Sequence, residues 1–325
     1  MNRNRTSMWK SRKLRGALTI VVAILLGPWL FFRASSFQRK IQVVRIESVD
    51  WSRPRFPALR LKVATWNIAH GRGNTDSNIE EGGVEKRARI ELIADKLKEI
   101  NADIVLLNEV DFNCTWSGGQ NQAIELAQSA GYPFCATQAN LDFGFIYGRW
   151  YFGNAILSRY LIREATAVEL QPVNEWEDWL VGCKRGILCK CDIGGLDRIS
   201  IMGLHLESRG EAIRVKQVDQ VVEAARNISD GLVIAGDLNT TPLAAPHAAR
   251  DPDGVNAFEK LIQQLPSSFQ PVSFDAKDTF TFPAKTPIKI IDWILLPHGD
   301  WMHHSHEVIQ TELSDHLPVV SEIGR

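Results

Sequence analysis

Hydrophobic positions along the chain follow two spacings, and each spacing predicts one kind of element. Apolar residues that recur every three or four positions predict helices over 85–100, 120–130 and 209–228. Shorter apolar runs predict strands near 59–66, 103–107, 151–158, 161–170, 186–193, 198–206, 232–235, 290–296, 306–312 and 317–322. Several of these strands follow one another with no helix between them, so the pattern predicts a two-layered α+β sandwich rather than a doubly wound sheet.

The N-terminal segment has the features of a membrane address. Gly16–Phe32 contains no charged residue, and as a helix it would extend about 25 Å, the lower limit for crossing a bilayer. Basic residues precede it, so the positive-inside rule makes 1–15 a cytoplasmic tip and 16–32 a transmembrane signal anchor. We expect a tether over 33–58 and one folded domain over 59–325, on the extracytoplasmic side of a bacterial inner membrane. A cleaved signal peptide and a buried core helix are the alternatives.

The charge of the chain is unevenly distributed. Nine of the 37 Lys and Arg residues lie within positions 1–40, which carry no acid, so the remainder has a formal charge of -10. Proteins that bind polyanions in general owe their affinity for phosphate largely to Lys and Arg. Beyond position 40 this chain has fewer Lys and Arg than Asp and Glu. A nucleic-acid partner is therefore possible but not favoured, since only a local groove or a bound metal ion would offset the mean field.

Polar residues stand where six of the predicted strands begin or end. A single Asp, Asn or His in such a place is usually a turn or cap residue, but six of them form a pattern. Carboxylates are the ligands that Mg²⁺ and Mn²⁺ prefer, so the acids in this set suit such an ion. The six positions are Asn67, Asn108 with Glu109, His205, Asp237 with Asn239, Asp292, and Asp315 with His316.

Six short motifs contain most of these polar residues or lie between them, in a fixed order along the chain. They are Trp66-Asn67-Ile68, Leu107-Asn108-Glu109-Val110-Asp111, Gly153-Asn154-Ala155-Ile156-Leu157-Ser158, Gly203-Leu204-His205-Leu206, Gly236-Asp237-Leu238-Asn239 and Ser314-Asp315-His316. Their order resembles the endonuclease/exonuclease/phosphatase superfamily, which includes deoxyribonuclease I, abasic-site endonucleases, sphingomyelinases and inositol-polyphosphate 5-phosphatases. The resemblance covers residues 60–323 and implies a four-layered α/β/β/α sandwich like that of deoxyribonuclease I, with 59–325 as the catalytic domain.

The resemblance implies a divalent metal cofactor, Mg²⁺ or Mn²⁺, and a set of ligands for it. Glu109 is the implied principal metal carboxylate, and Asn67 beside it contacts the metal or the phosphate. Asp315 adds a metal ligand or a supporting carboxylate. These roles agree with the preference of such ions for oxygen ligands.

The resemblance also implies the groups that act on the substrate. Asp237 orients or deprotonates the attacking water, and Asn239 holds a phosphoryl oxygen. His316 is a general base or a phosphate contact, oriented by Asp292. His205 supplies a further donor to the phosphate.

Two further residues are predicted to bind substrate. Asn154 lies within one of the matching motifs, and Arg185 fits a bacterial subgroup of the superfamily. A charge at the exposed edge of a strand is the alternative role for Arg185.

The expected function is hydrolysis of a phosphoester bond by in-line attack of an activated water on a small or lipid-linked phosphate ester. An exported nuclease similar to deoxyribonuclease I is the second hypothesis, and a non-catalytic binding module of the same fold is the third. The third would be signalled by losses at Glu109, Asp237 or His316, and the sequence has none. The expected partners are the substrate and, through the N-terminal helix, a membrane; no protein partner is inferred.

Overall fold

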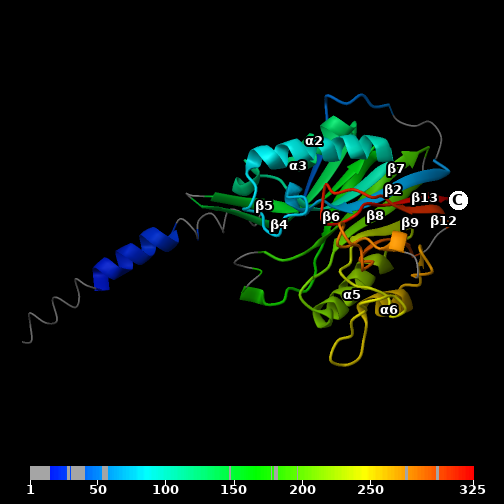
Figure 1. Cartoon of the computed structure of the whole chain (residues 1–325). Coiled ribbons are helices and arrows are strands. Elements are labelled where there is room, and N and C mark those ends of the chain that lie inside the picture. The colour runs from blue at the N-terminus through cyan, green and yellow to red at the C-terminus, as the bar shows by residue number, and fades with distance from the viewer. Residues whose placement is uncertain are drawn as a thin grey trace, which may run out of the picture.

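A first sheet of seven strands occupies one half of the computed structural model (Figure 1). β2 and β3 run parallel to each other, and the other neighbours are antiparallel. In spatial order the strands are β1 (Ile41–Arg45), β4 (Phe134–Phe145), β5 (Gly148–Ser158), β3 (Ile104–Asp111), β2 (Arg60–Asn67), β13 (Val319–Gly324) and β12 (Met302–Val308). The structure describes residues 15–27, 30, 41–52, 58–145, 148–176, 178, 182–195, 197–274, 277–297 and 300–325.

A second sheet of six strands packs against the first. β8 and β9 are its parallel pair, and the remaining neighbours are antiparallel. Its spatial order is β10 (Ser268–Phe269), β11 (Asp292–Leu296), β9 (Gly231–Asp237), β8 (Asp197–His205), β7 (Gly186–Gly194) and β6 (Leu161–Val168). Each sheet thus has a parallel pair near its centre, and these pairs matter for the site described below.

Helices cover the outer face of each sheet. α2 (Gly83–Ile100) and α3 (Gln122–Ala130) lie on the first sheet, and α5 (Glu211–Arg226) and α6 (Ala257–Gln264) lie on the second (Figure 1). Three separate groups of buried side chains fill the spaces between these layers. The predicted four-layered α/β/β/α sandwich is therefore confirmed, with two layers more than the hydrophobic pattern alone indicated.

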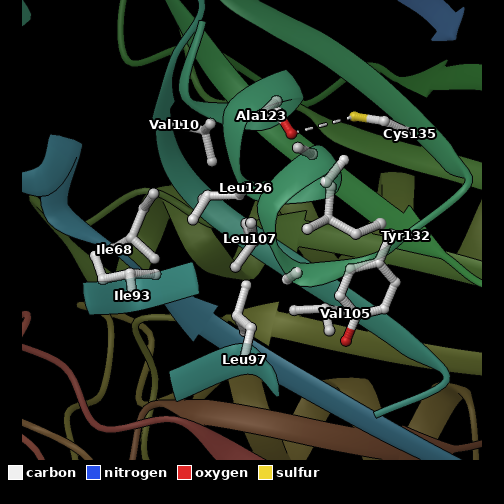
Figure 2. Close-up of a cluster of buried hydrophobic side chains, with 14 of the residues drawn as sticks. Ile68, Ile93, Leu97, Val105, Leu107, Val110, Ala123, Leu126, Tyr132 and Cys135 are labelled. Carbon is white, nitrogen blue, oxygen red and sulfur yellow. Dashed lines mark hydrogen bonds between the residues drawn. The ribbon is translucent and has the colours of Figure 1, made fainter. Parts of the chain in front are cut away.

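Strand β3 shows how one strand serves two of these cores. Val105 and Leu107 pack against α2 and α3, whereas Ile104 and Leu106 face the second sheet. This follows from the alternation of side chains across a strand, which lets a fully apolar run be buried on both faces. Figure 2 shows the first of these cores, where Leu97 of α2 lies beside Val105 and Leu107.

The predicted helix and strand positions need three corrections. Residues 41–45, expected in the tether, form β1 and pair with β4, so the folded body begins before Leu59. β4 and α6 were not predicted. The strand expected over 306–312 is instead β12, Met302–Val308, whose polar residues are tolerated because it lies at the edge of the sheet.

The N-terminal segment is only partly within the described residues. Residues 15–27 form a helix, whereas 1–14, 28–29 and 31–40 of the expected tip, anchor and tether lie outside the described residues, as do 53–57. Among the helices that the structure describes, none has both the length and the apolar character required to cross a membrane.

Candidate active site

The ends of the two parallel pairs meet at one edge of the sandwich. Asn67 at the end of β2 stands opposite Asn108 of β3, and His205 at the end of β8 stands opposite Asp237 of β9. Asp292 flanks Asp237 from the other side, on β11. Hydrogen bonds join the sheets here. Asn67 Nδ2 donates to Asp237 Oδ2 at 3.1 Å, the Asp237 backbone N–H donates to Asn108 Oδ1 at 3.0 Å, and Asn108 Nδ2 donates to the Leu204 carbonyl at 3.1 Å.

A pocket of about 380 Å³ opens at this edge. Asn67 and Asp292 lie behind its wall and are hydrogen-bonded to wall residues, Asn67 to Asp237 and Asp292 to His316. Eight of the ten predicted site residues are thus brought together. The six that line the pocket directly are Glu109, His205, Asp237, Asn239, Asp315 and His316.

Glu109 reaches the pocket because β3 departs from regular geometry. The pairing of β3 with β5 shifts register between Leu107 and Val110, and Glu109 has a φ of 53°. A bulge of this kind redirects a side chain out of the normal alternation. The Glu109 carboxylate is a quarter exposed, with its oxygens 3.5 Å from His70 Nε2 and 3.9 Å from His205 Nε2.

The Glu109 carboxylate fits a divalent ion. Burial would raise its pKa, but His70, His205 and Lys184 together lower it, so the group is ionised. It accepts no hydrogen bond from any residue within the described part of the chain, which leaves its oxygens free toward the pocket. An ionised carboxylate with unused lone pairs, in a pocket that Asp315 also lines, offers the oxygen ligands that hard divalent ions prefer. The Asn67 amide is already engaged, since its Oδ1 accepts from the Ala69 backbone N–H and its Nδ2 donates to Asp237.

His316 is held between two carboxylates. Its Nδ1 donates to Asp292 Oδ2 at 2.9 Å, and its Nε2 lies 3.8 Å from Asp237 Oδ2. Burial would lower the pKa of His316, but Asp292 and Asp237 outweigh it and raise the pKa to about 10. These three side chains lie close enough to hold a metal ion, yet a protonated His316 already balances the two acids.

Asp237 owes its position to a glycine. The preceding residue, Gly236, has a φ of 137°, and a Cβ there would lie 1.9 Å from the carbonyl oxygen of Leu204 on β8. Only glycine permits that approach. Burial raises the pKa of Asp237 to about 6, although His316 opposes the change. Asn239 follows, and its backbone N–H donates to Asp237 Oδ1 at 2.9 Å.

Three residues of the site were not singled out from the sequence. Lys184 lines the pocket, where its Nζ contacts His205 Nε2; burial lowers the pKa of Lys184 even though Glu109 and Asp237 oppose that effect. Arg72 also lines the pocket and donates to Asp315 Oδ2 at 2.6 Å. His70 contacts Glu109. His70 and Arg72 come soon after Asn67, and that proximity was the available signal; Lys184 had none.

The two predicted substrate contacts have other partners. Asn154 Oδ1 accepts from Asn108 at 2.8 Å, and its Nδ2 donates to the carbonyl of Arg185 at 2.8 Å. The Arg185 guanidinium donates to Glu169 at 2.9 Å and to Asp178 at 3.1 Å. Neither side chain lines the pocket. Asn154 supports the wall through its hydrogen bond with Asn108, and contact of either residue with substrate stays a prediction.

Comparison with known proteins agrees with this architecture. The model of the Endonuclease/Exonuclease/phosphatase family matches residues 64–316, so the chain belongs to this family. Members of the family are generally phosphoesterase hydrolases that use divalent metals. No curated protein sequence matches the chain.

Solved structures share the fold at low sequence identity. The endonuclease/exonuclease/phosphatase from Bacteroides vulgatus aligns with a TM-score of 0.61 at 17% identity, covering 82% of this chain and 99% of its own. The human Nocturnin catalytic domain with bound sulfate aligns with a TM-score of 0.57 at 16% sequence identity, and the alignment covers 89% of this chain and 98% of the Nocturnin domain. A mannosyl-6-phosphatase from Bacteroides thetaiotaomicron aligns with a TM-score of 0.59 at 14% sequence identity, and the alignment covers 82% of this chain and 100% of that protein.

The pairing of His316 with Asp292 is directly testable. In Asp292→Asn, measured in EDTA by NMR titration of the imidazole signals, the pKa of His316 should fall from about 10 toward its ordinary range, because the anion that stabilises the imidazolium is gone. Asp253→Asn, which changes an exposed acid, should leave the titration unmoved. An unchanged His316 titration in Asp292→Asn would show that Asp292 does not orient this ring.

Proposed function

We propose that this protein is a divalent-metal-dependent phosphoesterase that hydrolyses a small or lipid-linked phosphate ester by in-line attack of an activated water. The observation that carries the proposal is the meeting of Glu109, Asp237 and His316 in one pocket, although these residues come from distant parts of the chain. A phosphate ester is anionic and resists attack, so its hydrolysis requires charge neutralisation and an aligned nucleophile. The pocket offers groups for both requirements.

Asp237 is the proposed acceptor of the water proton. With a pKa of about 6 it is ionised at neutral pH and more basic than an ordinary aspartate. His316, with a pKa of about 10, carries its proton at the same pH and therefore suits a donor to a phosphoryl oxygen better than a base. Of the two roles that the resemblance implies for His316, general base and phosphate contact, the raised pKa supports phosphate contact.

Further groups that line the pocket would bind the remaining phosphoryl oxygens. Lys184 Nζ contacts His205 Nε2, and Asn239 lines the same pocket. Donors fixed before the substrate binds stabilise developing charge without reorganisation during the reaction. Lys184 and His205 are thus proposed to bind phosphate, with Asn239 as a neutral donor.

The proposed metal ligands are Glu109, Asn67 and Asp315. When bound there, Mg²⁺ or Mn²⁺ supplies a Lewis acid that withdraws charge from the phosphate. Asp315 is shared with Arg72, which holds its carboxylate in place at the rim. The His316 cluster is the less suitable position, because its carboxylates already contact a cationic ring.

The size and charge of the pocket support a small substrate group. A volume of about 380 Å³ accommodates a phosphorylated head group or sugar rather than a duplex. The negative charge of the chain beyond position 40 argues against a long polyanion. The name of the Bacteroides thetaiotaomicron neighbour, a mannosyl-6-phosphatase, shows that this fold serves such substrates elsewhere.

The activity is testable with a panel of phosphomonoesters, phosphodiesters and lipid head groups, assayed on the purified protein with Mg²⁺, Mn²⁺ or EDTA. We expect metal-dependent turnover that falls at least about 100-fold in Glu109→Gln, because a bound metal contributes several kcal/mol to such barriers. Glu223→Gln is the matched control, since its side chain is 67% exposed on α5. Turnover that persists in EDTA or in Glu109→Gln would refute the metal assignment.

A plasmid-nicking assay under the same conditions separates the nuclease hypothesis from the proposed function. Cleavage of supercoiled DNA without turnover of any small ester would favour an exported nuclease. Absence of turnover on both, with the fold intact, would favour the binding module.

We also propose that Gly16–Phe32 anchors the protein in a membrane, with the folded body on the extracytoplasmic side. The uncharged run and the basic residues before it support this placement. The protein should resist alkaline carbonate extraction from bacterial membranes, and protease added outside spheroplasts should digest the body. Release into the soluble fraction, or protection of the body from the protease, would contradict the anchor or its orientation.

A further inference from the structure

A second histidine–aspartate pair lies beside Glu109, separate from His316 and Asp292. His70 Nδ1 donates to Asp111 Oδ1 at 2.6 Å, and its Nε2 faces Glu109 Oε2 at 3.5 Å. His70 is only 7% exposed and Asp111 is fully buried. The proposed chemistry uses neither residue, and no part of the reaction scheme explains why two such groups are buried here.

The ring of His70 is fixed from several directions. Asp111 Oδ2 accepts from the Trp116 indole at 2.7 Å, so both oxygens of this carboxylate are bound. Gln122 Nε2 donates to the His70 carbonyl at 2.9 Å, while its Oε1 accepts from the Asp111 backbone N–H at 2.9 Å. Phe152 packs edge-on against the imidazole with ring centres 5.0 Å apart. Only the Nε2 edge of His70 is left to face Glu109.

The backbone at this contact is strained on both sides. Ala69 and His70 have φ values of 48° and 56°, and Glu109 has a φ of 53°. Each such residue costs on the order of 1–3 kcal/mol and persists where the surroundings fix it. Such strain is most simply explained when it brings together side chains that a relaxed backbone would keep apart.

We propose that His70 and Asp111 are positioning residues for Glu109, which set the direction of its carboxylate toward the divalent ion. The proposal rests on the role of Glu109 as the metal carboxylate in the proposed function. His70 Nε2 faces Oε2 of Glu109, and Asp111 fixes the ring of His70 through its hydrogen bond to Nδ1. Groups that orient a metal ligand in this way typically raise metal affinity roughly 10–100-fold.

The contact between His70 and Glu109 is weak, but it is enough to orient the Glu109 carboxylate, which would otherwise be mobile. The 3.5 Å separation between His70 Nε2 and Glu109 Oε2 is an ionic contact rather than a hydrogen bond, and no described residue donates a hydrogen bond to Glu109. Without His70, the Glu109 side chain would turn away from the pocket or toward His205, whose Nε2 lies 3.9 Å from Oε1. Affinity for the ion would then fall, although no ligand had been removed.

The test measures Mn²⁺ affinity of the full-length protein by EPR, which detects the signal of free Mn²⁺. His70→Gln and Asp111→Asn should each weaken Mn²⁺ binding roughly 10–100-fold. The double variant should lose little more than the worse single variant, because the two residues act in series. His304→Gln, an exposed histidine on β12, should bind Mn²⁺ as the unaltered protein does.

Glu109→Gln separates failure of this proposal from failure of the proposed function. Loss of Mn²⁺ binding in Glu109→Gln, with unaltered affinity in His70→Gln and Asp111→Asn, would overturn the positioning role alone. Unaltered affinity in Glu109→Gln would overturn the metal assignment itself. Where His70→Gln does not fold, Trp116→Phe replaces it, since it removes the indole donor to Asp111; a several-fold loss of affinity is expected, and no loss overturns the proposal.

A spectroscopic measurement distinguishes a positioning residue from a direct ligand. Electron spin echo modulation of Mn²⁺ bound to protein with ¹⁵N-labelled histidine detects any nitrogen bonded to the ion. A nitrogen coupling that disappears in His70→Gln would make His70 a ligand and overturn the indirect role. The same coupling pattern in both proteins, together with the weaker affinity of the variant, supports it.

Discussion

Two hydrogen bonds at Asp237 join the ends of the two sheets, and the position of every group in the pocket depends on them. Asn67 and Asn108, from the parallel pair of the first sheet, both bind Asp237 of the second. All three are almost completely buried, so breaking either contact would leave polar groups without partners at a cost of about 1–3 kcal/mol each. The sheets therefore cannot slide past one another without losing the site.

Most charged groups in the pocket lie next to a group of opposite charge. His316 lies between Asp292 and Asp237, Arg72 binds Asp315, and Lys184 faces Glu109 across His205. Asp292 and Asp237 raise the pKa of His316 and so keep its ring protonated, and the cations near Glu109 lower the pKa of its carboxyl and keep it ionised, whereas burial alone would favour the neutral form of both. The site is thus charged and mostly buried, and burial strengthens the electrostatic stabilisation of a phosphate.

The sequence was informative wherever a strand ended in a polar residue. Asn67, His205 and Asp237 were predictable because parallel strands end at the same edge of a sheet, and side chains at those ends must meet. Lys184 and the His70–Asp111 contact depend on a loop conformation and on a bulge in β3, and neither leaves a periodic signal. β1 was missed because five residues at a sheet edge resemble a tether in composition. The packing of four layers followed from the resemblance, not from the hydrophobic pattern.

The direct test of this account is the location of the ion. Crystals soaked in Mn²⁺ and measured near the manganese absorption edge give an anomalous signal that identifies the metal without reference to the protein. The account predicts one strong peak bonded to the Glu109 carboxylate. A peak enclosed by Asp237, Asp292 and His316 with none at Glu109, or no peak in a pocket of unchanged shape, would contradict it.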